Sequence, residues 1–241
     1  MLSAKADLLA GLQSDILRLE GFKSVTSPSV DGGLGPIRDA FPNANFPLGA
    51  VHEFLSAKAE ETAAATGFIA GLLASLMKGG GVSLWISTSR MVFPPALKNF
   101  GIDPDRIIFV DLPREKEVIW AVDEALKCSA LTAVIAEMNG ISFTYSRRLQ
   151  LAVENSQVTG FLFRNDSPRP NATACFSRWR IQPLPSEPID DLPGIGSSAW
   201  RVELLKIRNG RPGTWNIHWK NGIFQSVQLP SVIAPQQMKA G

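Results

Sequence analysis

One junction in the sequence has the position, though not the residues, of a nucleotide-phosphate loop. Residues 54–68, FLSAKAEETAAATGF, run from an apolar stretch into a segment of helical character. A loop of the form G-x-x-x-x-G-K-[ST] needs glycines so that its backbone can surround the phosphates, and a lysine to balance their charge. Placed at Ser56, the template has Glu61 and Thr62 where its second glycine and its lysine belong. Placed one residue earlier, it has two glutamates there.

The carboxylates of this junction oppose phosphate binding. Two like charges ~4 Å apart repel by about 4 kcal/mol at an effective dielectric constant near 20. Acidic side chains in the first turn of a helix also interact favourably with the helix dipole, which explains them without a ligand. We therefore predict a degenerate loop in which Ser56, Glu61 and Thr62 bind no nucleotide, and we expect no cofactor and no metal.

Other residues with chemical potential are isolated in the sequence. Glu137 ends a predicted strand at the sheet edge where functional residues gather, and an acid there could hold Mg²⁺. Without a phosphate loop such an ion has little to bridge, so we favour a hydrogen-bonding or capping role for this degenerate acidic position. His52 and His218 belong to no Ser–His–Asp pattern, and Cys128 and Cys175 have no histidine at ligand spacing.

Cations and tryptophans alternate in the last third of the chain. Cations combined with aromatic rings on strands can contact a nucleic-acid backbone or stack on bases. The alternative is a solvated sheet face whose tryptophans pack into the core. The candidate partner or DNA surface consists of Arg178, Arg180, Arg201, Lys206, Arg208, Arg211 and Lys220.

Regular elements alternate between residues 49 and 164. Apolar runs predict strands, and apolar residues at three- and four-residue spacing predict helices. The strands are expected at 51–55, 82–88, 106–111, 132–137 and 158–163, and the helices at 60–78, 94–100, 117–126 and 145–156. This alternation predicts an α/β fold with a mostly parallel sheet flanked by helices.

The two ends of the chain differ from this core. Residues 1–48 are expected to form a helix, with a stripe of leucines and one isoleucine, followed by an irregular connection rich in Gly and Pro. In residues 165–241, strand-like runs and the hairpin turn NGRPG predict an antiparallel extension that completes the same domain. The stripe, a candidate interface for self-association or a partner that could equally fold back on its own core, consists of Leu8, Leu9, Leu12, Ile16 and Leu19.

Composition is that of an ordinary globular protein. Of the 241 residues, 45% are hydrophobic and 19% are charged, and the formal net charge is +2. So small a charge argues against non-specific nucleic-acid binding but leaves room for a local basic patch. The longest uncharged stretch, residues 62–77, is shorter than the roughly 20 residues that span a bilayer. We expect a cytoplasmic protein without membrane contact.

Several segments, in this order and spacing, resemble the ImuA family, the RecA-like accessory proteins of bacterial mutagenic translesion synthesis. The likeness covers about residues 10 to 225. The segments are LQSDILRLEG, PLGAVHEFL, FGIDPDRIIFV, YSRRLQLAVENSQVTGFLFR and WRVELLKIRNGRPGTWNIHW. The resemblance implies a RecA-like core, in which the strand at 82–88 would be followed by a catalytic glutamate. This chain has Ser89 there, and the DNA-binding loops expected after residues 137 and 164 are short.

The resemblance also implies partners. The expected function is a non-catalytic adaptor of the SOS-inducible mutasome, which binds an ImuB-like inactive relative of Y-family polymerases and, through the complex, a DnaE-type error-prone polymerase. Contacts with RecA, self-association and weak contact with DNA are further expectations. Two alternatives stay open: a RecA-type ATPase that acts as a recombination mediator, and a cell-division inhibitor that resembles SulA.

Overall fold

The computed structural model describes residues 33–41, 44–165, 170–187 and 196–227. In these residues the strands are β1 (Val51–Ser56), β2 (Val82–Ser87), β3 (Ile107–Asp111), β4 (Leu131–Met138), β5 (Thr159–Asn165), β6 (Ser177–Glu187), β7 (Ser197–Ile207), β8 (Gly213–Lys220) and β9 (Ile223–Ser226). The α-helices are α2 (Ala59–Leu76), α3 (Glu115–Ala125) and α4 (Phe143–Ser156), and the 3-10 helices are η1 (Gly35–Ala40), η3 (Pro94–Phe100) and η4 (Pro104–Arg106). The predicted leucine stripe of residues 1–20 lies outside the described residues.

The strands form one nine-stranded sheet in the order β3-β2-β4-β5-β1-β6-β7-β8-β9. All pairs from β3 to β6 are parallel, and all pairs from β6 to β9 are antiparallel. This confirms the predicted α/β fold, its mostly parallel sheet flanked by helices and its antiparallel C-terminal strands. The sheet continues across residue 165, because β6 pairs directly with β1.

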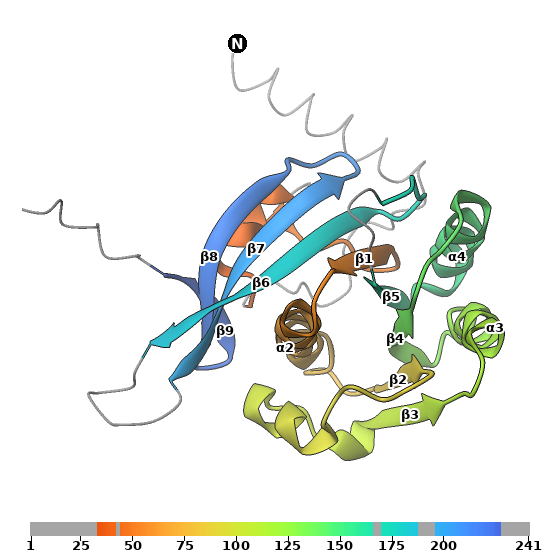
Figure 1. The fold of residues 1–241 in the computed structure, drawn as a ribbon, viewed down its shortest axis with the longest axis horizontal. Coiled ribbons are helices and arrows are strands. Elements are labelled where there is room, and N and C mark those ends of the chain that lie inside the picture. The colour runs from red at the N-terminus through yellow and green to blue at the C-terminus, as the bar shows by residue number, and fades with distance from the viewer. Residues whose placement is uncertain (1–32, 42–43, 166–169, 188–195, 228–241) are drawn as a thin grey trace, which may run out of the picture.

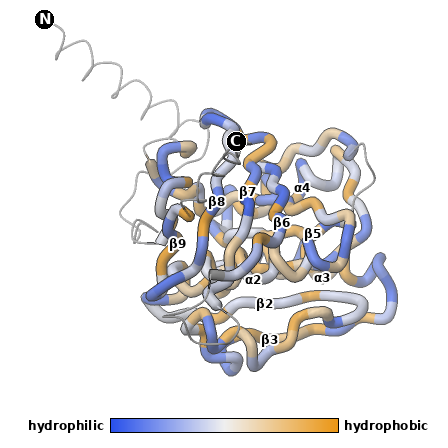
Figure 2. Tube along the Cα trace, turned by 60° about the vertical axis from the view of Figure 1, so that its left-hand side comes forward, coloured by the Kyte–Doolittle hydropathy of each residue, from blue (hydrophilic) through white to orange (hydrophobic). Residues whose placement is uncertain are grey.

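The sheet curls around α2, and α3 and α4 lie on its other side (Figure 1). Phe68 and Leu72 of α2 belong to a large buried cluster inside the curl that also includes Trp179 and Phe224 from the C-terminal strands. Val122 of α3 belongs to a separate, smaller cluster on the opposite face, beneath α3 and α4. Hydrophobic and hydrophilic residues alternate along several strands, and hydrophilic stretches also lie in loops at the edge of the molecule (Figure 2). The hydrophobic core thus consists of two layers, one on each face of the sheet.

Two turns shape the C-terminal strands. The predicted hairpin turn joins β7 and β8, which pair antiparallel. A further strand, β9, follows a turn at Asn221 and Gly222, whose φ angles are 54° and 77°. Two consecutive residues with positive φ are typical of a type I′ hairpin, and Asn-Gly is its preferred sequence. We did not predict β9, although this dipeptide was its signal.

Among the described helices, none is both long enough and apolar enough to cross a lipid bilayer.

Candidate functional site

The loop between β1 and α2, which we predicted to be degenerate, is bonded to a side chain from the first turn of α2. Only Ala57 and Lys58 separate the strand from the helix. The carboxylate of Glu61 accepts a hydrogen bond from the backbone N–H of Ala57 at 2.8 Å and another from the side-chain amide of Gln182 on β6 at 3.3 Å. Backbone N–H groups at the start of a helix are the donors that a bound phosphate would use. Here an internal carboxylate bonds to the N–H of Ala57, the loop residue just before the N-cap residue Lys58.

The hydroxyl of Thr62 is bonded within the start of the helix. The backbone N–H and the hydroxyl of Thr62 both donate to the carbonyl of Lys58, at 3.1 and 3.3 Å. Ser56 is buried, and its hydroxyl has no hydrogen-bond partner within the described part of the chain. Lys58, the residue that caps the helix, is exposed. The bonds between Thr62 and Lys58 stabilise the start of the helix. Thr62 stands where the template, placed at Ser56, has its lysine.

A hollow of about 110 Å³ lies beside the start of α2, lined in part by Thr62, Ser89, Glu115, Glu137 and Asn139. It lies where parallel strands place functional residues, at the carboxyl ends of β2 and β4. A water molecule takes up about 30 Å³ of liquid, so the hollow holds a few waters. Pockets for drug-sized ligands or cofactors measure about 300–1,000 Å³. The hollow is therefore smaller than the pockets that enclose such ligands.

Both acids of this hollow already have partners. Glu137 accepts a hydrogen bond from the indole N–H of Trp85 at 2.8 Å, and burial raises the pKa of its carboxyl. The carboxylate of Glu115 accepts from the backbone N–H and the side-chain amide of Asn139, at 2.7 and 2.8 Å. Glu137 thus makes a hydrogen bond within the sheet, and its role stays a prediction. No group of three or more His, Cys, Asp or Glu that could hold a metal occurs in the described ranges.

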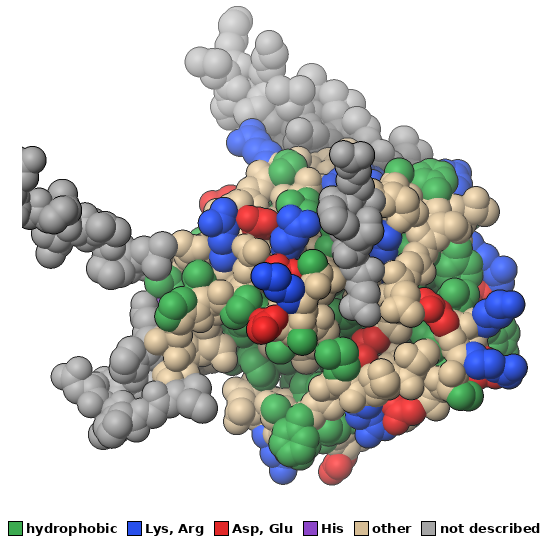
Figure 3. Space-filling model, in the orientation of Figure 1, with side chains coloured by type: hydrophobic (Ala, Val, Ile, Leu, Met, Phe, Trp, Pro, Cys, Tyr) green, Lys and Arg blue, Asp and Glu red, His purple; other side chains and the backbone are tan. Residues whose placement is uncertain are grey.

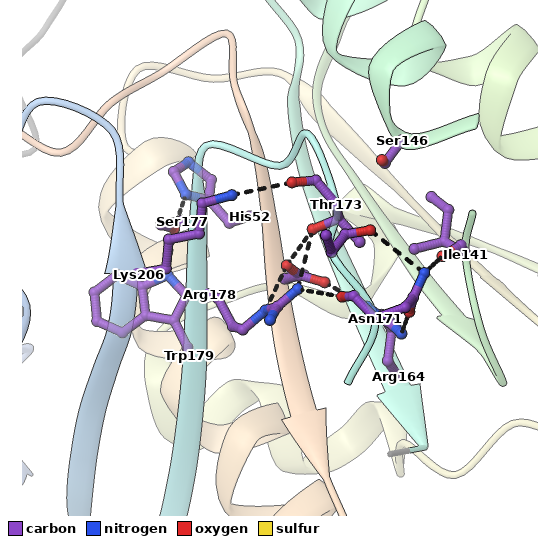
Figure 4. Close-up of polar contacts among 12 residues, drawn as sticks. His52, Ile141, Ser146, Arg164, Asn171, Thr173, Ser177, Arg178, Trp179 and Lys206 are labelled. Carbon is purple, nitrogen blue, oxygen red and sulfur yellow. Dashed lines mark hydrogen bonds and ion pairs between the residues drawn. The ribbon is translucent and has the colours of Figure 1, made fainter. Parts of the chain in front are cut away.

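The most densely bonded polar group in this part of the molecule is one that we did not predict from the sequence. Glu53, in the middle of β1, is fully buried. Its Oε2 accepts from Nη1 of Arg164 on β5 at 2.7 Å. Its Oε1 accepts from Nε of Arg178 on β6 at 2.8 Å and from the hydroxyl of Thr173. Figure 4 shows Arg164, Thr173 and Arg178 side by side in this cluster. One carboxylate therefore joins three neighbouring strands.

The segment before β6 closes this buried cluster. The side-chain oxygen of Asn171 accepts from Nη2 of Arg164 at 2.6 Å, and its backbone carbonyl accepts from Nη2 of Arg178 at 2.8 Å. The ammonium of Lys206 donates to the carbonyl of Thr173 at 3.0 Å. The side chain of Arg178 is only 14% exposed. Although we predicted Arg178 as part of a surface, it belongs to the interior, because Glu53 lies beside it in the sheet.

His52 is also internal, on the opposite face of β1. Its Nε2–H donates to the carbonyl of Pro47 at 2.8 Å, so its Nδ1 accepts from the hydroxyl of Ser177 at 2.6 Å. That hydroxyl accepts in turn from the indole N–H of Trp179 at 2.6 Å. Burial lowers the pKa of His52 to about 4. The ring is therefore neutral at physiological pH and connects the carbonyl of Pro47 to the hydroxyl of Ser177.

The remaining predicted cations lie on the outer face of the C-terminal strands or in their turn. The side chains of Arg180 and Arg201 are 35% and 51% exposed and flank Glu203 at 3.9 and 3.1 Å. Lys206, Arg211 and Lys220 are exposed, and the guanidinium of Arg208 lies 5.8 Å from the centre of the Phe176 ring. Lys and Arg side chains gather over β6, β7 and β8, with acidic side chains between them (Figure 3).

The tryptophans of these strands do not share that outer face. Trp179 and Trp200 are buried. Trp215 and Trp219 are partly buried and pack against the large core cluster. Since stacking on bases needs exposed rings, the structure favours the interpretation in which the tryptophans are core residues.

The fold and these contacts define an α/β protein whose sheet is parallel in one half and antiparallel in the other, with an internally closed loop at the position of a phosphate site. No protein-family profile matches the chain. It is similar to Protein ImuA of Caulobacter vibrioides, in strains NA1000 / CB15N and ATCC 19089 / CIP 103742 / CB 15. The identity is 35% over 204 residues, which is 80% of this chain and 81% of the relative. The chain belongs to the ImuA family.

Proposed function

We propose that this protein is a non-catalytic adaptor of SOS-inducible, error-prone translesion DNA synthesis. It binds an ImuB-like inactive relative of Y-family polymerases and, through that complex, supports a DnaE-type polymerase. Membership of the ImuA family supports this role. The observation that carries the non-catalytic part is the hydrogen bond from the Ala57 N–H to the Glu61 carboxylate.

That contact opposes both binding and hydrolysis of ATP. Phosphoryl transfer depends almost entirely on positioning and on neutralisation of charge by backbone N–H groups, a lysine and Mg²⁺. Here a carboxylate lies at the loop, Thr62 replaces the lysine, and the adjacent hollow measures about 110 Å³. A phosphate entering the loop would have to displace Glu61 and would meet its negative charge.

Calorimetry tests the proposal with two titrants, magnesium-ATP and the purified ImuB-like protein of the same organism. We expect no heat of binding from magnesium-ATP up to millimolar concentration, and a saturable complex with the ImuB-like protein that is indifferent to ATP. Micromolar binding of ATP by the wild-type protein would contradict the non-catalytic role, and turnover of ATP would support the RecA-type alternative. Inhibition of FtsZ assembly by the purified protein would support the SulA-like alternative.

A further inference from the structure

The outer side of the C-terminal strands and the adjoining flank of α4 form one surface that combines cations with exposed apolar side chains. We call it the α4–β7 surface and define it by Phe143, Arg147 and Leu151 from α4 and Arg201, Leu205 and Lys206 from β7. We propose that the α4–β7 surface binds an acidic amphipathic segment of the ImuB-like partner. This inference rests on the adaptor function proposed above.

The two halves of the surface are held on either side of a single chain segment. The carbonyl of Thr173 accepts from the ammonium of Lys206 on β7 at 3.0 Å. The N–H of the next residue, Ala174, donates to the hydroxyl of Ser146 on α4 at 2.9 Å. Figure 4 shows Ser146, Thr173 and Lys206 in this arrangement. Helix and strand are therefore neighbours at this point, with only the strip before β6 between them.

The flank of α4 with the three surface residues faces away from α3. Tyr145 and Arg148 bond to α3, through the carbonyl of Ile119 and the carboxylate of Asp123. On the other side of the helix, the side-chain oxygen of Gln150 accepts from the backbone N–H of Val51 at 3.1 Å.

Residues four apart share one flank of a helix, so Phe143, Arg147 and Leu151 follow one another along α4. Arg147 lies one turn before Gln150, on the side of β1 and the C-terminal strands. Phe143 is 50% and Leu151 51% exposed. Two large apolar side chains are thus presented on either side of a cation.

A β-bulge adds an aliphatic side chain to the strand half. Trp179 pairs with Leu204 and Arg178 pairs with Lys206, so Leu205 is the extra residue of β7. A bulge re-aims side chains at the point where it interrupts the ladder. Leu205 is 39% exposed although Leu204 is buried. An apolar group therefore lies on the outer face next to Lys206.

The positive charge of the α4–β7 surface favours an acidic partner. Of the side chains described in β6 to β9, Glu203 is the acid, and it lies between Arg180 and Arg201. On α4, Glu154 accepts from Gln150 and is the acid nearest to this flank. The cations Arg147, Arg201 and Lys206 of the surface, together with Arg180 beside it, outnumber these acids. The surface would therefore attract the carboxylates of a partner.

Protein fits the apolar part of the surface better than nucleic acid does. Phosphates form ion pairs with cations but gain nothing from exposed leucines, and the tryptophans of the C-terminal strands pack in or against the core. An amphipathic segment with carboxylates beside apolar residues would use both kinds of group, with apolar anchors at the centre and ion pairs around them.

The test measures the affinity of the full-length protein for the purified ImuB-like protein and for a labelled single-stranded DNA oligomer. The variants are Arg147→Glu, Lys206→Glu and Leu205→Ser. The control Lys98→Glu makes the same charge change at an exposed residue of η3, outside the α4–β7 surface and outside the predicted cation set. We expect each of the first three to raise the Kd for the partner at least tenfold, and the control to leave it within twofold.

The outcomes separate this inference from the function on which it rests. If the wild-type protein does not bind the ImuB-like protein at all, the proposed function is wrong. If the wild type binds and the three variants bind equally well, the inference is wrong and the function stands. Loss of DNA binding with unchanged partner binding would also overturn it. Because Lys206 contacts the carbonyl of Thr173, the melting temperature of the Lys206→Glu variant is measured as well. If that variant is destabilised, the Arg147→Glu and Leu205→Ser variants decide the outcome.

Discussion

Two carboxylates of this protein each lie between two arginines, and the two groups differ in almost everything else. Glu53 lies between Arg164 and Arg178, with side chains 0%, 4% and 14% exposed. Glu203 lies between Arg180 and Arg201, with side chains 19%, 35% and 51% exposed. Arg178 and Arg180 are two residues apart on one strand and point to the same side of the sheet.

Strand neighbours and the covering segment explain the difference. Arg178 pairs with Glu53 across β1 and β6, whereas the neighbour of Arg180 on β1 is Leu55. Asn171 and Thr173 cover the first pair and complete its hydrogen bonds. A charge that has lost its water depends on its partner for several kcal/mol, while a hydrated pair is worth about 0–1 kcal/mol. The same residue types thus provide structural stability in one place and an accessible surface in the other.

The largest expected effect comes from breaking the buried group. Glu53→Gln keeps the shape of the side chain but leaves two guanidinium groups buried without a counter-charge. We expect a loss of about 3–5 kcal/mol in the free energy of unfolding, measured by urea denaturation at neutral pH. Removing a cation as well, in Glu53→Gln with Arg178→Gln, should recover part of that loss. A loss below about 1 kcal/mol would mean that the group is hydrated and no different from that of Glu203.

Acid should weaken the interior of β1 through its histidine. The pKa of His52 is lowered by burial from 6.5 to about 4, so the folded protein keeps this ring neutral while the unfolded chain binds a proton below pH 6.5. The stability that this neutral ring provides is complete above pH 6.5 and is lost as the pH falls towards 4. The full loss in the free energy of unfolding is about 3 kcal/mol, since one pKa unit corresponds to roughly 1.4 kcal/mol.

Urea unfolding from pH 7 to pH 4 measures this effect, and His52→Phe supplies the control. The phenyl ring does not titrate, so the variant retains only the pH dependence of other groups, including Glu137, whose pKa burial raises. We expect the free energy of unfolding of the wild-type protein to exceed that of the variant at pH 7, and this excess to shrink steadily as the pH falls. A difference that stays constant from pH 7 to pH 4 would contradict the buried, neutral state of His52.

Much of the fold was predictable because it depends on local periodicity. Apolar runs and helical spacing predicted the strands and helices of residues 49–164, and alternation of the two predicted a parallel sheet. The four-residue strand β9 was missed, since IFQS alone is too short to show a period, although Asn221-Gly222 marked its turn. Local patterns are readable when an element is long or carries a strong turn signal.

The polar groups were less predictable because their partners are distant in the chain. Glu53 meets Arg164 and Arg178 across 111 and 125 residues, and no local pattern fixes those pairings. One signal was available: a carboxylate in the middle of a strand covered on both faces requires a cation or donors. The sequence predicted a carboxylate at the loop from Glu61 itself, whereas its hydrogen bond from Gln182 depends on the packing of β6 against α2.

The smallest effect on stability is expected at the exposed group around Glu203, and it can be compared directly with the effect at Glu53. Glu203→Gln makes the same chemical change as Glu53→Gln, also between two arginines. Arg180 lies 3.9 Å and Arg201 3.1 Å from this carboxylate, and both guanidinium groups can exchange it for water. We expect the free energy of unfolding to fall by no more than about 1 kcal/mol, and added salt to reduce the difference further because exposed charges are screened. Urea denaturation of both glutamine variants at low and high salt measures this directly. A loss at Glu203 as large as that at Glu53, and insensitive to salt, would place Arg180 and Arg201 in the interior and remove the strand half of the α4–β7 surface.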